Sequence, residues 1–105
     1  MIATILALLI SLLPQPLQEL PHAFPREGAK QLIDNERVTV WEATWVKGKA
    51  TAMHRHRFDM VYVELADATV RVTNQTGTAT NASPKLGQAQ FLQKGVTHME
   101  EGTSD

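Results

Sequence analysis

Two of the four histidines are separated by a single residue, in the segment His54-Arg55-His56. If that segment is a strand, residues i and i+2 point to the same face, so both imidazoles converge on one point. His98 lies in a later segment with strand character, and antiparallel pairing would bring it against the first two. Neutral imidazoles are good ligands for zinc, iron, copper, nickel and cobalt. We therefore expect His54, His56 and His98 to bind a metal ion, with His22 outside the site.

The segments that position these histidines are expected to be short strands. From residue 38 onward, β-branched and aromatic residues alternate with turn residues every 8 to 12 positions, and no 3.6-residue period is long enough for a helix. Trp41 and Trp45 share the face of their strand that is expected to be better buried, and Val70 and Val72 are expected to point inward. The strands are expected at 38–46, 51–56, 60–66, 69–73, 78–82, 88–92 and 96–101. This pattern predicts an all-β sandwich or barrel.

The first 20 residues differ in composition from the rest of the chain. Residues 1–13 include 11 apolar side chains, and the first charged side chain is Glu19. Such a run is short for a transmembrane helix and typical of the apolar region of a secretory signal peptide. We expect residues 1–20 to be a signal peptide or a membrane-tethering segment of a periplasmic or secreted protein. The alternative is a cytoplasmic protein in which this segment packs on the barrel.

Length, charge and cysteine content exclude several classes of protein. The 105 residues allow one domain, expected at 36–105, after a proline-containing linker at 21–35. A formal net charge of −1 offers no basic stripe, so we expect no nucleic-acid partner. The absence of cysteine excludes disulfides, thiolate nucleophiles and cysteine-ligated metals.

Glycines accompany the histidines at fixed spacings. One glycine stands six residues before the first histidine of the pair, and two stand eleven and three residues before the last histidine. The six positions are Gly48, His54, His56, Gly87, Gly95 and His98. In order and spacing they resemble the two motifs of the cupin superfamily, over residues 36–105, and residues 37–42 look like the first barrel strand of small single-domain bacterial cupins. The resemblance implies a small jelly-roll barrel, also called a double-stranded β-helix, with one divalent metal ion inside its mouth.

The chain departs from the first cupin motif at the carboxylate ligand. That position falls at Met60 or Val61, neither of which carries a carboxylate. Asp59 is one residue early and could reach the metal only if a bulge re-aims it. Glu64 lies roughly 13 Å beyond residue 60 on a straight strand. We therefore expect a site of three histidines, with Asp59 as the candidate for a fourth ligand.

The chain also departs from the second motif and ends early. Gln93 and Gly102 stand where the motif has proline and asparagine, which marks a divergent member. Asp105 follows His98 by seven residues, whereas similar small cupins add another strand. We expect the barrel to lack its last strand, either because the sequence is a fragment or because a second copy completes the barrel in a homodimer.

Two functions are compatible with these residues. The first is a metal-dependent enzyme, an oxygenase or isomerase that acts on a small molecule. The second is a non-catalytic barrel outside the cytoplasm that binds a small molecule or a metal. The metal could be iron, manganese, zinc, nickel, cobalt or copper. The alternative is a barrel that binds no metal and whose histidines are hydrogen-bonded core groups.

Arg55 and Arg57 are expected to point to solvent, unless a bulge turns one inward to hold an anionic substrate. The candidate lining of a substrate pocket is Met60, Tyr62, Trp41 and Trp45.

Overall fold

The described part of the chain is built from eight strands. The structure is a computed structural model that describes residues 19–105, so the expected signal peptide or tethering segment at 1–20 lies, apart from residues 19 and 20, outside it. The strands are β1 (Ala29–Asp34), β2 (Thr39–Ala43), β3 (His54–Arg55), β4 (Met60–Val63), β5 (Val70–Asn74), β6 (Ala79–Ala82), β7 (Ala89–Leu92) and β8 (Thr97–Gly102). The predicted all-β class is confirmed.

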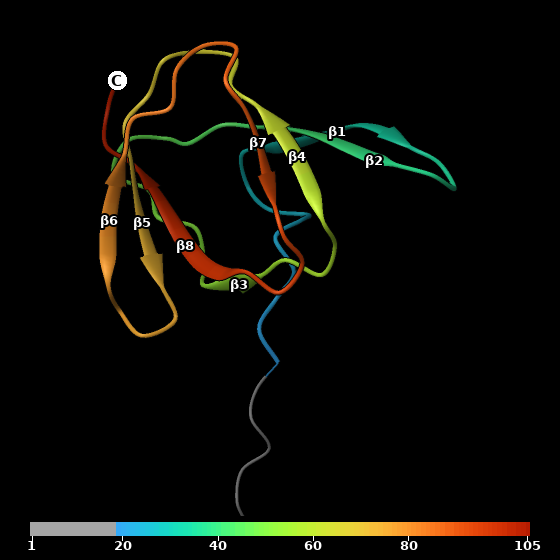
Figure 1. Ribbon diagram of the computed structural model, residues 1–105, viewed down its shortest axis with the longest axis horizontal. Coiled ribbons are helices and arrows are strands. Elements are labelled where there is room, and N and C mark those ends of the chain that lie inside the picture. The colour runs from blue at the N-terminus through green and yellow to red at the C-terminus, as the bar shows by residue number, and fades with distance from the viewer. Residues whose placement is uncertain (1–18) are drawn as a thin grey trace, which may run out of the picture.

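The eight strands form three antiparallel sheets (Figure 1). The largest has the order β3-β8-β5-β6, and the others are the pairs β4-β7 and β1-β2. The four-stranded sheet and the β4-β7 pair lie on either side of the interior of a small jelly-roll barrel, and the β1-β2 hairpin projects away from both. Within the described residues, no helix has the length and apolarity needed to cross a membrane. The pairing of β8 with β3 positions the site, because these strands carry His98 and His54, and His56 follows directly after β3.

The expected faces of the strands are confirmed where they can be compared. Val70 of β5 is 2% exposed, and Val72 is half-buried on the same face. Trp41 and Trp45 are half-buried, whereas the valines of the opposite face, Val38, Val40 and Val46, are exposed. The period of two residues therefore assigns these faces correctly.

Part of the segment expected to be a linker forms strand β1. Its sequence, Ala-Lys-Gln-Leu-Ile-Asp, has few residues that favour a strand, so local propensity does not indicate one. The strand forms because a turn folds it onto β2, with a register shift between Gln31 and Ile33. Asn35 stabilises that turn, since its side-chain oxygen accepts hydrogen bonds from the backbone N–H groups of Arg37 and Val38 at 2.8 and 2.9 Å.

Residues 21–26 begin beside β3 and are called the strap below. The backbone N–H of Arg55 donates to the carbonyl of Pro21 at 2.9 Å, so the strap begins with a bond to the strand of the first histidines. Ala23, in the middle of the strap, is 1% exposed. Phe24 stacks on Trp41 with ring centroids 5.2 Å apart. The strap is therefore packed against the β domain.

The distribution of polarity in this barrel is the reverse of the usual one. Among the described residues, the buried apolar side chains are Ala23, Val70 and Pro84. Five titratable side chains are buried, namely His54, His56, Glu64, His98 and Glu100. The outer face of the β4-β7 pair is apolar, with exposed Val61, Val63 and Phe91. Because burying polar groups costs free energy unless they have partners, the polar interior calls for a ligand or a network that satisfies it.

Candidate metal site

Three imidazoles meet at one end of the barrel interior. His54 on β3 lies directly opposite His98 on β8 in the register of the sheet. His56 follows two residues later on the same face, where its N–H and carbonyl continue the pairing with Val96 and Gly95. The three ring centroids are 4.9 to 5.0 Å apart, and the three residues are 2–8% exposed. The structure therefore brings together the three histidines that the sequence singled out.

The tautomer of His54 is set by its own backbone. Its Nδ1 lies 2.8 Å from the carbonyl oxygen of Ala52, and since a carbonyl only accepts, Nδ1 carries the proton. Nε2 is then an unprotonated acceptor. It is buried and has no hydrogen-bond partner. A carbonyl that orients one ring nitrogen and leaves the other free and buried is the arrangement found in metal-binding histidines, so this residue fits a metal ion.

Glu100 is the fourth member of the cluster. It lies two residues after His98 on β8, and its Oε1 is 3.0 Å from the Nε2 of His98. That same Nε2 is 3.1 Å from the Nε2 of His56. One donor atom from each of the four residues, His54, His56, His98 and Glu100, lies within 4.8 Å of the others. Such a cluster could hold a metal ion.

The carboxylate of Glu100 is also bound from its other side. Its Oε2 accepts a hydrogen bond from the indole N–H of Trp45 at 2.9 Å and lies 3.3 Å from Nη1 of Arg26. Burial alone would raise the pKa of Glu100. Hydrogen bonds from His98 and Trp45 and the charge of Arg26 outweigh that effect and lower the pKa to about 2. Glu100 is therefore a carboxylate, the form that ligates metals.

Burial keeps the first two histidines neutral. It lowers the pKa of His54, although the hydrogen bond to Ala52 partly opposes this effect. Burial, together with the proximity of His98 and His54, lowers the pKa of His56 to about 4. Only the neutral imidazole has a lone pair for a metal, so burial favours the form of both side chains that can act as a ligand.

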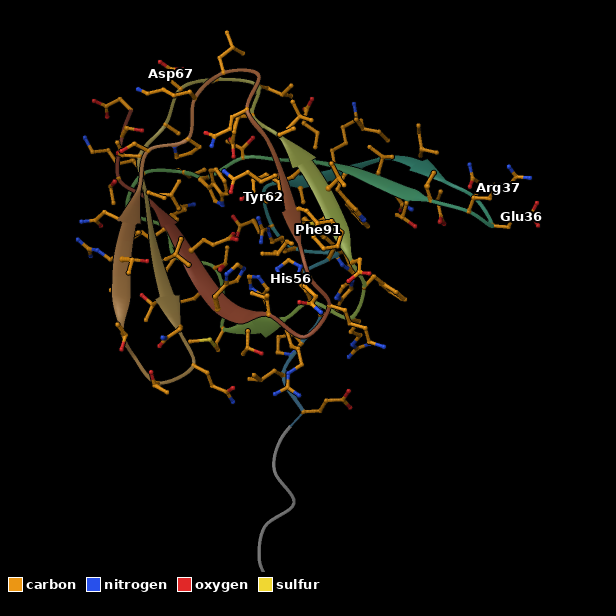
Figure 2. The ribbon with its side chains drawn as sticks, in the orientation of Figure 1. Glu36, Arg37, His56, Tyr62, Asp67 and Phe91 are labelled. Carbon is orange, nitrogen blue, oxygen red and sulfur yellow. The ribbon has the colours of Figure 1, made fainter. Side chains whose placement is uncertain are left out.

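Tyr62 of β4 and Glu64, just after it, add two more polar side chains to the interior. Met60 and Tyr62 are half-buried on its inner face, and Glu64, just beyond its end, is 8% exposed. Figure 2 shows Tyr62 and His56 inside the barrel. Burial and the charge of Glu100 raise the pKa of Glu64, and burial and the charge of Glu64 raise the pKa of Tyr62. The side chains of Tyr62, Glu64 and Glu100 are therefore close enough in the barrel interior to affect one another's pKa.

The four side chains expected to line a substrate pocket lie in three places. Trp45 lines a cavity of about 340 Å³ that His54 also borders. Trp41 lines a different cavity, of about 280 Å³, beside Phe24 and Phe58. Met60 and Tyr62 border neither of these cavities. Of the four, Trp45 is the one whose cavity reaches a histidine of the cluster.

Asp59, the expected candidate for a fourth ligand, does not lie in the cluster. Its side chain is exposed, and its Oδ1 accepts a hydrogen bond from the backbone N–H of Lys94 at 2.8 Å. It fixes the connection between β7 and β8 instead. Arg55 and Arg57 are exposed, as expected. No bulge turns either of them inward.

Glu100 is the member of the cluster that sequence reasoning missed. The signal was present, because His98 and Glu100 stand two residues apart in a segment expected to be a strand. The argument that places His54 and His56 on one face applies equally to this pair. The cupin motif instead places the carboxylate ligand near residues 59–61.

No protein-family model matches the chain. The beta-alanine degradation protein BauB of Pseudomonas aeruginosa is 38% identical to the chain over 66 residues. The matched stretch covers 63% of this chain and 68% of that protein.

Proposed function

Because the chain belongs to the same family as the beta-alanine degradation protein BauB, we propose that it is a small cupin that uses one divalent metal ion to act on a small molecule. The spacing of the glycines and histidines supports the cupin assignment, and the all-β barrel agrees with it. The name of the relative places that protein in the breakdown of beta-alanine. We extend this to a role in the turnover of a small metabolite of similar size.

The observation that carries the proposal is the orphaned Nε2 of His54. It is a buried acceptor without a partner, and such atoms are rare in native proteins because they lose their bonds to water. A metal ion in the cluster would satisfy it, together with His56, His98 and Glu100. A hydrogen-bonded core histidine, the alternative without a metal, would have both ring nitrogens paired.

The donor set is one carboxylate and three imidazoles, with the donor atoms within 4.8 Å of one another. Iron, manganese, nickel, cobalt, copper and zinc all accept such ligands. An ion that takes more than four ligands would keep positions open for water or substrate. When bound, such an ion supplies Lewis acidity, and a redox-active one also supplies electron transfer.

Metal titration followed by thermal unfolding tests the proposal. Metal that binds the folded chain raises Tm by mass action, and each of His54→Ala, His56→Ala and His98→Ala should lose most of that rise. His22→Ala is the matched control, because His22 lies on the strap and contacts Arg55 and Arg57 rather than the cluster. If all four variants respond to iron, manganese, nickel, cobalt, copper and zinc as the parent does, there is no such site. Metal binding without turnover or oxygen consumption would assign a binding protein rather than an enzyme.

We also propose export through the apolar segment at the start of the chain. Its support is the run of uncharged residues that precedes Glu19. Residues 1–30, fused to a reporter that is active only outside the cytoplasm, should export it, and Leu9→Arg should abolish the activity. Equal reporter activity in both fusions would remove the case for a targeting segment.

A further inference from the structure

Arg26 differs from every other Arg and Lys side chain of the described residues, because it alone is not exposed. Its side chain is 16% exposed, whereas Arg57 and Arg71 are 53% and 52% exposed. Burial of a guanidinium is costly unless it is paired. A largely buried arginine beside the cluster of histidines and Glu100 therefore needs an explanation beyond the solvation of the surface.

The contacts of Arg26 hold its guanidinium in place but use few of its donors. The group lies over the ring of Phe24, 4.9 Å from the centroid. Nη1 is 3.3 Å from Oε2 of Glu100, and this is its ion-pair partner in the described part of the chain. An arginine has five N–H donors in a planar fork, so most of them remain available. The side chain is a preorganised donor group with spare capacity.

These donors border the cavity of about 340 Å³ described above. Arg26, Trp45, Thr51 and His54 all line it. Thr51 accepts a hydrogen bond from the backbone N–H of Glu100 at 3.0 Å, which leaves its own O–H free to donate. The volume lies at the lower end of the range for small-molecule sites. The cavity thus offers arginine and hydroxyl donors within reach of a histidine of the cluster.

The geometry points to a small carboxylate as the ligand: we propose that Arg26, with Thr51, binds the carboxylate of a small anion in this cavity, next to the metal cluster. A planar guanidinium matches the two oxygens of a carboxylate, which it can bind with two parallel hydrogen bonds. Glu100 shows that a carboxylate already fits beside Arg26. This proposal rests on the proposed function only for the substrate's place beside the metal, since the donors are present without it.

Glu100 contacts both the histidines and Arg26, so metal binding by Glu100 would affect how Arg26 binds an anion. Glu100 faces His98 with one oxygen and Arg26 with the other. If Glu100 ligates the metal of the proposed function, part of its charge is neutralised there and its attraction for Arg26 weakens. The guanidinium can then exchange this partner for the carboxylate of a substrate. Anion affinity should therefore be higher with metal than without it.

Calorimetric titration with propionate and with propylamine tests the proposal. The two probes have similar chain length and opposite charge, so they separate an anion site from a cation site. The parent chain should bind propionate in preference to propylamine. Arg26→Lys, which keeps the charge beside Glu100 but loses the planar fork, should weaken propionate binding by at least about tenfold. Arg55→Lys is the matched control, because Arg55 is exposed and should bind propionate as the parent does.

A second measurement covers the case in which Arg26→Lys does not fold. In NMR spectra of the parent chain, the Nε–H signal of Arg26 should shift on addition of propionate and stay in place on addition of propylamine. An unchanged signal, or equal propionate affinity in a folded Arg26→Lys, overturns the proposal. So does preferential binding of propylamine.

The same samples distinguish this proposal from the proposed function. Propionate binding that depends on Arg26 in a chain that binds no metal would uphold the anion site and refute the metal site. Metal binding without propionate binding would do the reverse.

Discussion

The low pKa of His56 predicts that the metal-free protein loses stability as the pH falls below neutral. An unfolded histidine has a pKa near 6.5, and that of His56 in the folded chain is about 4. Between these values the unfolded chain takes up a proton that the folded chain does not. Stability is therefore complete above pH 6.5 and declines as the pH falls towards 4. The full loss is about 3 kcal/mol, since one pKa unit corresponds to about 1.4 kcal/mol.

That loss is large beside the total stability of a native protein, which is about 5 to 15 kcal/mol. Urea unfolding with a chelator present, from pH 7.5 to pH 4.5, measures it. The lower limit leaves out most of the range in which Glu100 titrates, because its pKa of about 2 makes its contribution decline between pH 4.5 and 2. His56→Gln should lose much less stability over this range, and His22→Gln should lose as much as the parent. A parent whose stability changes by less than about 1 kcal/mol, or an equal loss in His56→Gln, would refute the reasoning.

Three further substitutions test how the site is supported, each by urea unfolding at pH 7. Val70→Ala removes one of the few buried apolar side chains and should cost about 1 to 3 kcal/mol, against less than about 1 kcal/mol for the exposed Val63→Ala. Trp45→Phe removes the N–H that donates to Glu100 and should cost about 1.5 to 3 kcal/mol, whereas an equal stability would mean that the bond contributes nothing. Gly102→Ala would place a Cβ 3.1 Å from the Cβ and the carbonyl oxygen of Trp45, so it should cost about 1 to 3 kcal/mol and alter tryptophan fluorescence. An unchanged spectrum in Gly102→Ala would show that the backbone moves instead.

The strands of the barrel could be predicted because their signals are local. Alternation with a period of two residues and turns at Gly77, Gly87 and Gly95 delimit five of the expected strands to within a few residues of those observed. The glycines at these turns have φ angles of 81 to 96°, a conformation that other residues rarely adopt. The same alternation places His54 and His56 on one face. The pairing of β3 with β8, which brings in His98, joins segments distant in sequence, so alternation alone offers it only as one possible antiparallel pairing, and the cupin motifs favour it.

Arg26 could not be predicted as part of the site, because its position depends on contacts distant in sequence. It stands 74 positions before Glu100, in a segment where prolines indicate a linker. The local sequence does not indicate that this segment packs against the β domain. Nor does it indicate that Phe24 stacks on Trp41 while the guanidinium of Arg26 lies over the ring of Phe24. Arg55, by contrast, is adjacent to two histidines in sequence but is exposed, because neighbours along a strand point to opposite faces. Proximity in sequence to the histidines therefore does not predict which arginine lies beside the cluster.

The polar interior and the metal proposal are connected through stability. A barrel that buries five titratable side chains, with Ala23, Val70 and Pro84 as its buried apolar ones in the described residues, gains little from hydrophobic burial. At a free metal concentration of 100 times Kd, binding adds about 2.7 kcal/mol to the folded state. That gain is similar to the loss of about 3 kcal/mol assigned to His56 at low pH. Metal and protons compete for the same lone pairs, so metal should protect the fold near neutral pH and cease to do so where the histidines become protonated. The arrangement that makes the metal-free barrel weak in acid is thus the one that would let it bind a metal, because both follow from burying imidazoles in their neutral form.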